Sequence, residues 1–201
     1  MSGRRKQELR EAMIVARLRL SPEDRAAFAH AIAARVTALE VFVRARTVAL
    51  YAPVGAEVDT AEIARTAEAL GKRVAFPRLV GGARVLAFAL CGEAALQPGA
   101  LGTREPPPGA PTVSPSEVGT VIVPGLAFDG CGRRLGRGRG YYDATLATLP
   151  AGTARVGLAF EAQIVPEVPH EAHDLALDVV VTETAVRFRP PGTAPSGDTS
   201  H

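Results

Sequence analysis

Between positions 47 and 76 the chain alternates strand-like and helix-like hydrophobic periods, and this alternation restricts the fold more than any other feature of the sequence. Residues 47–52 form a short β-rich run, residues 60–70 carry a helical pattern that stops at Gly71, and residues 73–76 form a second β-rich run. A strand, a helix and a strand in that order are typical of a right-handed βαβ crossover. The sequence therefore predicts a largely parallel sheet.

The remaining segments repeat both periods. Their spacing predicts helices over 4–19, 22–40 and 142–149 and strands over 85–90, 118–123, 155–160 and 179–181. With 201 residues, 47% of them hydrophobic, the chain is long enough to bury one core. We expect a single α/β domain over residues 1–188, with a mostly parallel central sheet flanked by helices in three layers, α/β/α. Residues 189–201, rich in proline and glycine, predict a disordered tail.

Hydropathy and cysteine usage restrict the location of the protein. The most apolar stretch near the amino end, residues 12–20, is interrupted by Arg17 and Arg19, so neither a membrane span nor a secretory signal peptide fits. Cys91 and Cys131 form no CxxC motif and suit a reducing compartment. We expect a cytoplasmic protein that binds no membrane and acts as a monomer.

Glycine and arginine alternate between positions 130 and 140, and this loop is the least ordinary stretch of the chain. Arg133, Arg134, Arg137 and Arg139 fall within seven residues of a chain whose formal net charge is only +2. Glycines let backbone N–H groups approach an anion, and guanidiniums match phosphate oxygens. The loop predicts a polyphosphate cradle, although it matches neither a Walker loop nor a dinucleotide fingerprint. A flexible basic loop or an RNA contact is the alternative.

Two aspartates are candidate magnesium ligands. Asp143 follows the loop directly and Asp174 lies in a distant segment, and Mg²⁺ takes one or two carboxylates together with phosphate oxygens. The alternative for Asp143 is a helix N-cap, and Asp129 is interpreted as a turn residue. Residues 170–174 fall short of HExxH spacing, so zinc is not expected. The proline-rich residues 103–116 predict an irregular loop.

Two of these segments carry a recognisable pattern. Val123-Pro-Gly-Leu-Ala-Phe-Asp129 and Arg134-Leu-Gly-Arg-Gly-Arg-Gly-Tyr-Tyr-Asp143 resemble the signature of the 5-formyltetrahydrofolate cyclo-ligase family, also called 5,10-methenyltetrahydrofolate synthetase. The resemblance covers about residues 6–183. Further blocks agree in order and spacing: Lys6, Leu9 and Arg10; residues 51–60; Phe76-Pro-Arg78; Gly157-Leu-Ala-Phe160; and Gln163, Pro169, Asp174 and Thr182.

The resemblance implies an enzyme that uses ATP and Mg²⁺ to convert 5-formyltetrahydrofolate to 5,10-methenyltetrahydrofolate, with release of ADP and phosphate. It implies catalytic roles for Arg137, Arg139 and Tyr141, and Mg²⁺ ligation by Asp143 and Asp174. The implied ATP-binding residues are Lys6, Arg10, Arg134, Leu135, Gly136, Arg137, Gly138, Arg139, Gly140, Tyr141 and Tyr142. The implied folate-binding residues are Ala52, Glu57, Arg137, Gly138, Arg139, Gly140 and Tyr141.

This sequence departs from the family pattern in two places. The family often carries lysine where Arg139 stands, and an aromatic residue sometimes found between positions 97 and 105 is absent. The alternative function is a non-catalytic relative that uses the arginine loop to hold a nucleotide or RNA. The acidic pair Asp143 and Asp174 beside the basic loop favours the enzyme, so a nucleic-acid partner is not expected.

Overall fold

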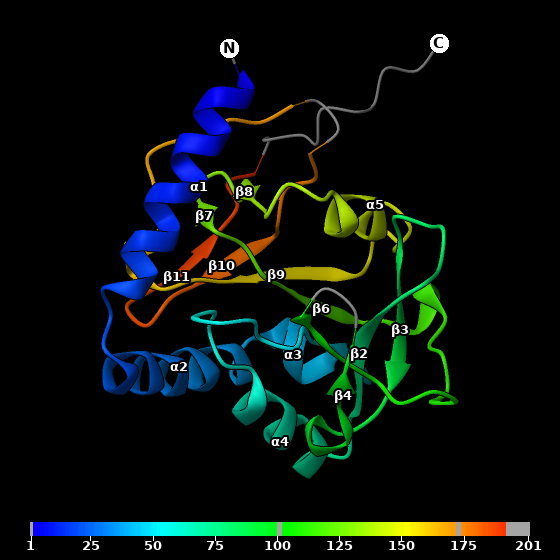
Figure 1. Cartoon of the computed structure of the whole chain (residues 1–201). Helices are drawn as coiled ribbons and strands as arrows, with labels where there is room; N and C mark the ends of the chain where they lie inside the picture. The colour runs from blue at the N-terminus through cyan, green and yellow to red at the C-terminus, as the bar shows by residue number, and fades with distance from the viewer. Residues whose placement is uncertain (1, 100–101, 172–173, 192–201) are drawn as a thin grey trace.

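A computed structural model describes residues 2–99, 102–171 and 174–191. Its centre is a seven-stranded sheet with the strand order β11-β10-β9-β6-β1-β2-β3 (Figure 1). The strands are β1 (Thr47–Ala49), β2 (Arg73–Leu79), β3 (Leu86–Leu90), β6 (Thr120–Val123), β9 (Ala154–Leu158), β10 (Val179–Val181) and β11 (Val186–Phe188).

The five inner strands run parallel, and the two edge strands, β3 and β11, run antiparallel to their neighbours. β1 pairs with β2 on one side and with β6 on the other. The chain therefore leaves β1 in one direction and later returns to its opposite side. This is a topological switch point, where crevices form outside the carboxyl ends of the strands. The predicted mostly parallel sheet is confirmed.

Each face of the sheet has its own core. Helices α2 (Pro22–Thr37), α3 (Glu40–Arg44) and α4 (Ala61–Ala69) cover one face with the fully buried Ile32, Phe42 and Ile63. On the other face, α5 (Tyr141–Leu146) buries Leu146 against a cluster that includes Phe128. The predicted three layers are confirmed.

The helix predicted over 22–40 is α2, which ends at Thr37, and a separate short helix, α3, begins at Glu40. Ser21 caps α2, because its Oγ accepts a hydrogen bond from the Asp24 backbone N–H at 3.0 Å, and Pro22 opens the first turn. The chain leaves the helix after Thr37 and becomes extended at Leu39, and α3 follows. Leu39 and Phe42 are both buried in the core.

Several short elements were missed by the sequence pattern. β11 was not predicted, and β2 continues through Leu79 rather than ending at Phe76. The loop predicted over 103–116 contains β5 (Arg104–Glu105), which pairs with β4 (Gln97–Pro98). Inside the glycine-rich segment, β7 (Ala127–Phe128) and β8 (Arg134–Leu135) form a hairpin. Three short 3₁₀ turns complete the described elements: η1 (Glu93–Ala95), η3 (Pro115–Glu117) and η4 (Glu161–Gln163).

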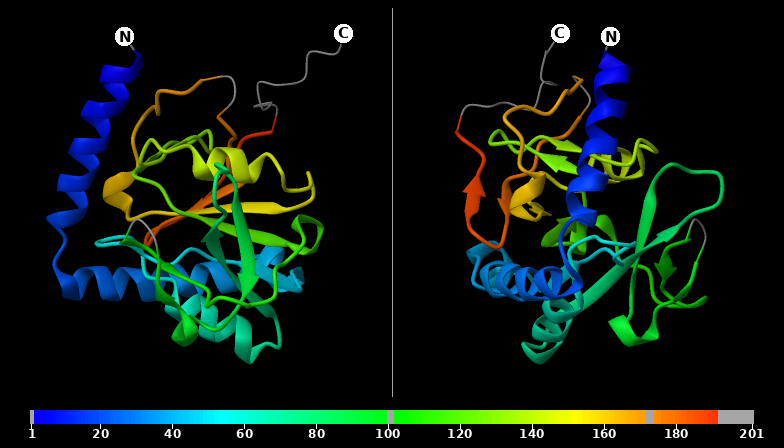
Figure 2. Two further views of the ribbon diagram at one scale, coloured as in Figure 1. Left: turned by 45° about the vertical axis from the view of Figure 1, so that its right-hand side comes forward. Right: turned by 60° about the vertical axis from the view of Figure 1, so that its left-hand side comes forward.

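Helix α1 (Ser2–Leu18) stands at one side of the molecule (Figure 2). It contacts η4 and β7, and its Leu9 and Met13 pack against Leu135 and Val168. No described helix is long and apolar enough to cross a membrane. At the other end of the chain, the Arg189 backbone N–H donates to the Asp178 carbonyl oxygen at 2.9 Å, whereas residues 192–201 of the predicted tail lie outside the described residues.

Candidate active site

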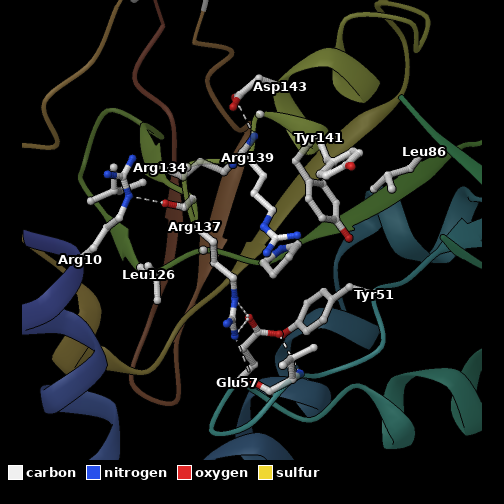
Figure 3. Close-up of a pocket in the computed structure, with 18 of the residues that line it drawn as sticks. Arg10, Tyr51, Glu57, Leu86, Leu126, Arg134, Arg137, Arg139, Tyr141 and Asp143 are labelled. Carbon is white, nitrogen blue, oxygen red and sulfur yellow. Dashed lines mark hydrogen bonds and ion pairs between the residues drawn. The ribbon is translucent and has the colours of Figure 1, made fainter. Parts of the chain in front are cut away.

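A cavity of about 720 Å³ opens at the switch point between β1 and β6 (Figure 3). The segments that follow these two strands supply part of its wall, including Ala52 and Gly125, and α1 and the glycine-rich loop supply much of the rest. Every site residue predicted from the sequence lines this one cavity: Lys6, Arg10, Ala52, Glu57, Arg134, Leu135, Gly136, Arg137, Gly138, Arg139, Gly140, Tyr141, Tyr142, Asp143 and Asp174.

Helix α1 contributes two cations, four residues apart on one face. Lys6 Nζ donates to Glu171 Oε1 at 2.9 Å and to Asp174 Oδ2 at 3.2 Å. Burial by itself lowers the pKa of Lys6, but these two carboxylates outweigh it and raise the pKa above the ordinary lysine value. Arg10 Nε donates to the Gly136 carbonyl oxygen at 3.0 Å. These bonds join α1 to the segment that carries Glu171 and Asp174 and to the glycine-rich loop.

The glycine loop must be free of side chains where it meets α1. Gly138 has φ 91°, a left-handed conformation that other residues rarely adopt. A Cβ built on Gly138 would lie 3.2 Å from the Arg10 guanidinium. Glycine at this position therefore allows the close approach between the loop backbone and Arg10.

Arg134 and Asp143 form a partly buried ion pair at the base of the loop. The Arg134 side chain is 3% exposed, and its Nη2 donates to Asp143 Oδ1 at 2.7 Å. Burial lowers the pKa of Arg134, and the negative charge of Asp143 opposes that shift. The N-cap alternative for Asp143 is wrong: the cap of α5 is Gly140, with φ 74°, and Asp143 lies inside the first turn, where its carboxylate faces the cavity.

Glu57 and Arg137 form a second pair across the cavity (Figure 3). Glu57 Oε1 accepts from Arg137 Nη2 at 2.9 Å and from Nε at 3.2 Å, while Oε2 accepts from the Val54 backbone N–H at 3.0 Å. The Glu57 side chain is 9% exposed and that of Arg137 is 51% exposed. Arg137 Nη2 also donates to the Val54 carbonyl oxygen at 3.2 Å, so both partners are bonded to the same loop, and Arg137 is the more exposed of the two.

Arg139 and Tyr141 occupy the middle of the cavity. Arg139 is exposed and makes no hydrogen bond or ion pair with another described residue. Figure 3 shows its side chain extending between Arg137 and Tyr141. A guanidinium without a protein partner is available to an incoming anion.

Asp129 is more than the turn residue predicted. It is 2% exposed; its Oδ1 accepts from the backbone N–H groups of Cys131 and Arg133 at 2.9 and 3.1 Å, and its Oδ2 accepts from that of Val168 at 2.9 Å. One buried carboxylate thus joins the glycine-rich segment to the segment that leads to Asp174. Because Val168 is distant from Asp129 in the sequence, no local pattern indicates the hydrogen bond between them.

Sequence reasoning also missed several cavity residues. Gln7 and Val54 lie within blocks that carry the resemblance but were not singled out, and other missed residues belong to segments without a motif: Ile14, Leu86, Arg104 and Glu105. Glu171 was considered only as part of an incomplete zinc motif, whereas it holds Lys6. Val54 follows the parallel strand β1, a position that indicates the binding edge of the sheet, whereas the others reach the cavity through contacts between segments distant in the chain.

The donor set fits magnesium better than zinc. Asp143 and Asp174 come from separate segments and line the same cavity, with side chains 30% and 22% exposed. Within the described ranges no group of three or more His, Cys, Asp or Glu side chains forms a metal cluster. Two carboxylates beside a cationic cradle match a cation that also binds phosphate oxygens and waters.

The cavity is lined with cations and carboxylates and lies at the switch point of a mostly parallel sheet. Doubly wound α/β proteins bind their ligands at this place, outside the carboxyl ends of the strands, and the cations suit an anionic ligand. Comparison with known proteins narrows this class. A family model described as the 5-formyltetrahydrofolate cyclo-ligase family matches residues 2–183. The chain belongs to this family and is an enzyme of the cyclo-ligase class.

Individual relatives agree with this assignment. The chain is 34% identical over 189 residues to a 5-formyltetrahydrofolate cyclo-ligase of Mycolicibacterium smegmatis, covering 90% of this chain and 95% of the relative. It is 33% identical over 171 residues to that of Escherichia coli, covering 83% and 94%. The NMR structure of Aquifex aeolicus 5,10-methenyltetrahydrofolate synthetase superimposes with a TM-score of 0.81 at 33% identity, covering 94% of this chain and 95% of that one.

Proposed function

We propose that this enzyme converts 5-formyltetrahydrofolate to 5,10-methenyltetrahydrofolate and that it uses ATP, which becomes ADP and phosphate, with Mg²⁺. The observation that carries the proposal is that one cavity has two regions of different chemistry. Cations from α1 and the glycine loop gather near Asp143 and Asp174, and Glu57 stands across from them beside Ala52. The first region suits a triphosphate, and the second suits a neutral ring with N–H donors.

The triphosphate would be held by Lys6, Arg10, Arg134 and the loop from Leu135 to Tyr142. Arg10 already donates to the Gly136 carbonyl oxygen of the loop, so this part of the cradle is preformed. Asp143 and Asp174 would hold Mg²⁺, which when bound neutralises charge on the phosphate oxygens. The acidic residues that now pair with Lys6 and Arg134 would then be shared with the cation.

The pterin edge would donate hydrogen bonds to Glu57, which requires an acceptor-only carboxylate. Both Glu57 oxygens accept hydrogen bonds within the protein, Oε1 from Arg137 and Oε2 from its own loop. Arg137 would therefore leave Glu57 and bind phosphate oxygens when both substrates enter. This exchange replaces one charge-assisted hydrogen bond by another.

The chemistry needs positioning and charge neutralisation more than covalent help from the protein. The formyl oxygen on N5 attacks the γ-phosphorus of ATP, an O–P bond forms, and the bond to the bridging oxygen breaks to release ADP. N10 then attacks the activated carbon and loses its proton, and phosphate departs with the formyl oxygen. Arg139, which has no partner among the described side chains, and Arg137 would stabilise charge on the transferring group, and Tyr141 would border both substrates.

We infer that the active unit is a monomer. Cys91 and Cys131 are both free thiols, which supports a reducing compartment, the cytoplasm.

The test is a direct assay. Purified protein with ATP, Mg²⁺ and 5-formyltetrahydrofolate is expected to develop the near-ultraviolet absorbance of the methenyl product and to release one phosphate per product formed. Omission of ATP or of Mg²⁺ should each abolish the signal. A folded protein that binds nucleotide but gives neither product nor phosphate would contradict the proposal and favour a binding protein of the same fold.

A further inference from the structure

The loop that carries Glu57, residues 51–60, forms no helix or strand, yet two buried hydroxyl groups join its ends. The Tyr51 hydroxyl donates to the Val58 carbonyl oxygen at 2.8 Å, and Thr60 Oγ1 donates to the Tyr51 carbonyl oxygen at 2.8 Å. Tyr51 is 2% exposed and Thr60 is fully buried. The Glu57 loop is therefore closed by side chains rather than by secondary structure.

These two bonds lie directly beside the cavity. Tyr51 lines the cavity, and Val58, whose carbonyl oxygen accepts its hydrogen bond, follows Glu57 in the chain. Figure 3 shows the Tyr51 ring with its hydroxyl turned toward the loop of Glu57. A buried hydroxyl or carbonyl group that loses its partner is unfavourable, so both bonds oppose opening of the loop.

Arg137 holds the same loop from the side of the cavity. Its guanidinium donates to Glu57 Oε1 at 2.9 and 3.2 Å and to the Val54 carbonyl oxygen at 3.2 Å. In the proposed reaction this guanidinium transfers to the triphosphate, and the loop then loses these three bonds. The bonds of Tyr51 and Thr60 do not involve Arg137, so they would remain.

We propose that Tyr51 and Thr60 are positioning residues for the cyclo-ligase reaction: their hydroxyl groups hold the Glu57 loop in the conformation that presents the Glu57 carboxylate to the folate, whether or not Arg137 is bound to it. This proposal rests on the proposed function, which gives Glu57 and Arg137 separate ligands. A loop that is ordered before the ligand arrives avoids the entropy cost of ordering on binding. The two hydroxyl groups therefore strengthen folate binding.

Two substitutions each remove one hydroxyl group and keep the approximate shape of the side chain: Tyr51→Phe and Thr60→Val. The matched control is Thr153→Val, because Thr153 is also buried and its Oγ1 also donates to a backbone carbonyl oxygen, that of Val118, at 2.9 Å. Thr153 precedes β9 and lies at the amino end of the parallel strands, whereas the cavity lies at their carboxyl ends. All three variants should lower the temperature of unfolding, because each leaves a carbonyl oxygen without its hydroxyl partner.

Folate binding should separate the control from the other two variants. In Tyr51→Phe and Thr60→Val we expect the KM for 5-formyltetrahydrofolate to rise about fivefold, the effect of about one net hydrogen bond, with kcat within about twofold of the wild type. The KM for ATP should stay within about twofold. Thr60→Ser, which keeps the hydroxyl group, should restore most of the folate KM, and Thr153→Val should match the wild type.

A double-mutant cycle tests whether the hydroxyl groups act through Glu57. Glu57→Ala removes the carboxylate and should itself raise the folate KM. In that background Tyr51→Phe should change the folate KM by less than about twofold, because the effects of residues that act through one another are not additive. A further rise of about fivefold would show that Tyr51 acts on the folate without Glu57 and would overturn the proposal.

Backbone hydrogen exchange gives a readout that needs no turnover. The Val54 N–H donates to Glu57 Oε2 inside the loop, so its exchange reports whether the loop keeps its conformation. Exchange of this group should be faster in Tyr51→Phe and Thr60→Val than in the wild type. In Thr153→Val it should match the wild type.

Two further results would overturn the proposal. The first is that Tyr51→Phe and Thr60→Val fold and keep the folate KM and the exchange rates of the wild type. The second is that Thr153→Val raises the folate KM as much as they do, which would assign the effect to a general loss of stability. If Thr60→Val does not fold, Tyr51→Phe is compared with Thr153→Val in its place. Absence of turnover in the wild type would instead count against the proposed function, and hydrogen exchange would still decide whether the two hydroxyl groups fix the loop.

Discussion

At the scale of single residues, the cations that line the cavity differ in whether another described residue already binds them. Lys6, Arg134 and Arg137 are each held by a carboxylate, whereas Arg139 extends into the cavity without an ion pair to any described residue. An ion pair with a carboxylate must be exchanged before a cation can bind phosphate, but Arg139 needs no such exchange. It is the side chain best prepared to meet the charge that develops on a transferring group.

Arg139→Met should therefore lower kcat by about 100-fold, the usual loss when one preorganised charge-stabilising group is removed. The temperature of unfolding should not change, because the exposed side chain makes no contact that the substitution breaks. Steady-state kinetics and thermal unfolding of the same preparation check this. A variant with the kcat of the wild type would remove Arg139 from the reaction.

Asp143→Asn should raise the Mg²⁺ concentration needed for half-maximal activity by about tenfold, because one of the two proposed carboxylate ligands becomes a neutral amide. It should also lower stability, since the Arg134 side chain, 3% exposed, loses its ionised partner. A metal titration at fixed ATP separates the two effects. If the titration curve is unchanged while stability falls, Asp143 serves Arg134 alone.

At the scale of elements, the sequence predicts the regular parts better than the connections between them. The βαβ unit follows from hydrophobic period and from glycine at Gly71, which adopts φ 70° after α4. β11 and the two strands of the β7–β8 hairpin are only two or three residues long, too short to show a period, and each pairs with its neighbour in the chain.

The residues of the site also divide into those that the sequence indicates and those that it does not. The glycine loop and the two aspartates could be found in the sequence because their residue types are unusual there. The contact of Asp129 with Val168 could not, since it arises from packing between segments distant in the chain.

Gly132 tests how the glycine-rich segment is fixed. It has φ 76°, and a Cβ there would collide with the carbonyl oxygen of Leu177, whose N–H donates to the Gly132 carbonyl at 2.8 Å. Gly132→Ala should destabilise the fold by about 3 kcal/mol, which lowers the unfolding temperature by about 6 to 12 °C. Gly130→Ala is the control, because no atom lies within 4 Å of its Cβ position. Equal unfolding temperatures for the two variants would contradict this account.

At the scale of the whole molecule, acid stability should depend on Glu161, which joins η4 to the β10–β11 edge of the sheet. Its carboxylate accepts hydrogen bonds from Thr182 and Thr184 and pairs with Arg187. Burial by itself raises the pKa of Glu161, but these partners outweigh it and hold the pKa below the ordinary value. A group with a lowered pKa in the folded state stabilises the fold above its unfolded pKa, about 4.3, and that stabilisation is lost as the pH falls further.

Glu161→Gln should therefore be less stable than the wild type at neutral pH and should lose less stability between about pH 5 and 3. Denaturant unfolding across that range measures the difference. Glu11→Gln, at an exposed residue of α1 that accepts from Gln7, should follow the pH dependence of the wild type. Parallel curves for Glu161→Gln and the wild type would show that Glu161 does not set the acid limit.

The sequence has two lysines, and the structure gives them very different surroundings. Lys6 lies in the cavity between Glu171 and Asp174, and Lys72 donates to the carbonyl oxygens of Val43 and Ala45 on the far side of the molecule. Amine-selective acylating reagents therefore have one side-chain target that reports on occupancy and one that serves as an internal reference. Mass spectrometry of the modified peptides, with and without nucleotide, would compare acylation of Lys6 with acylation of Lys72. This footprinting assay of the cavity needs no mutation.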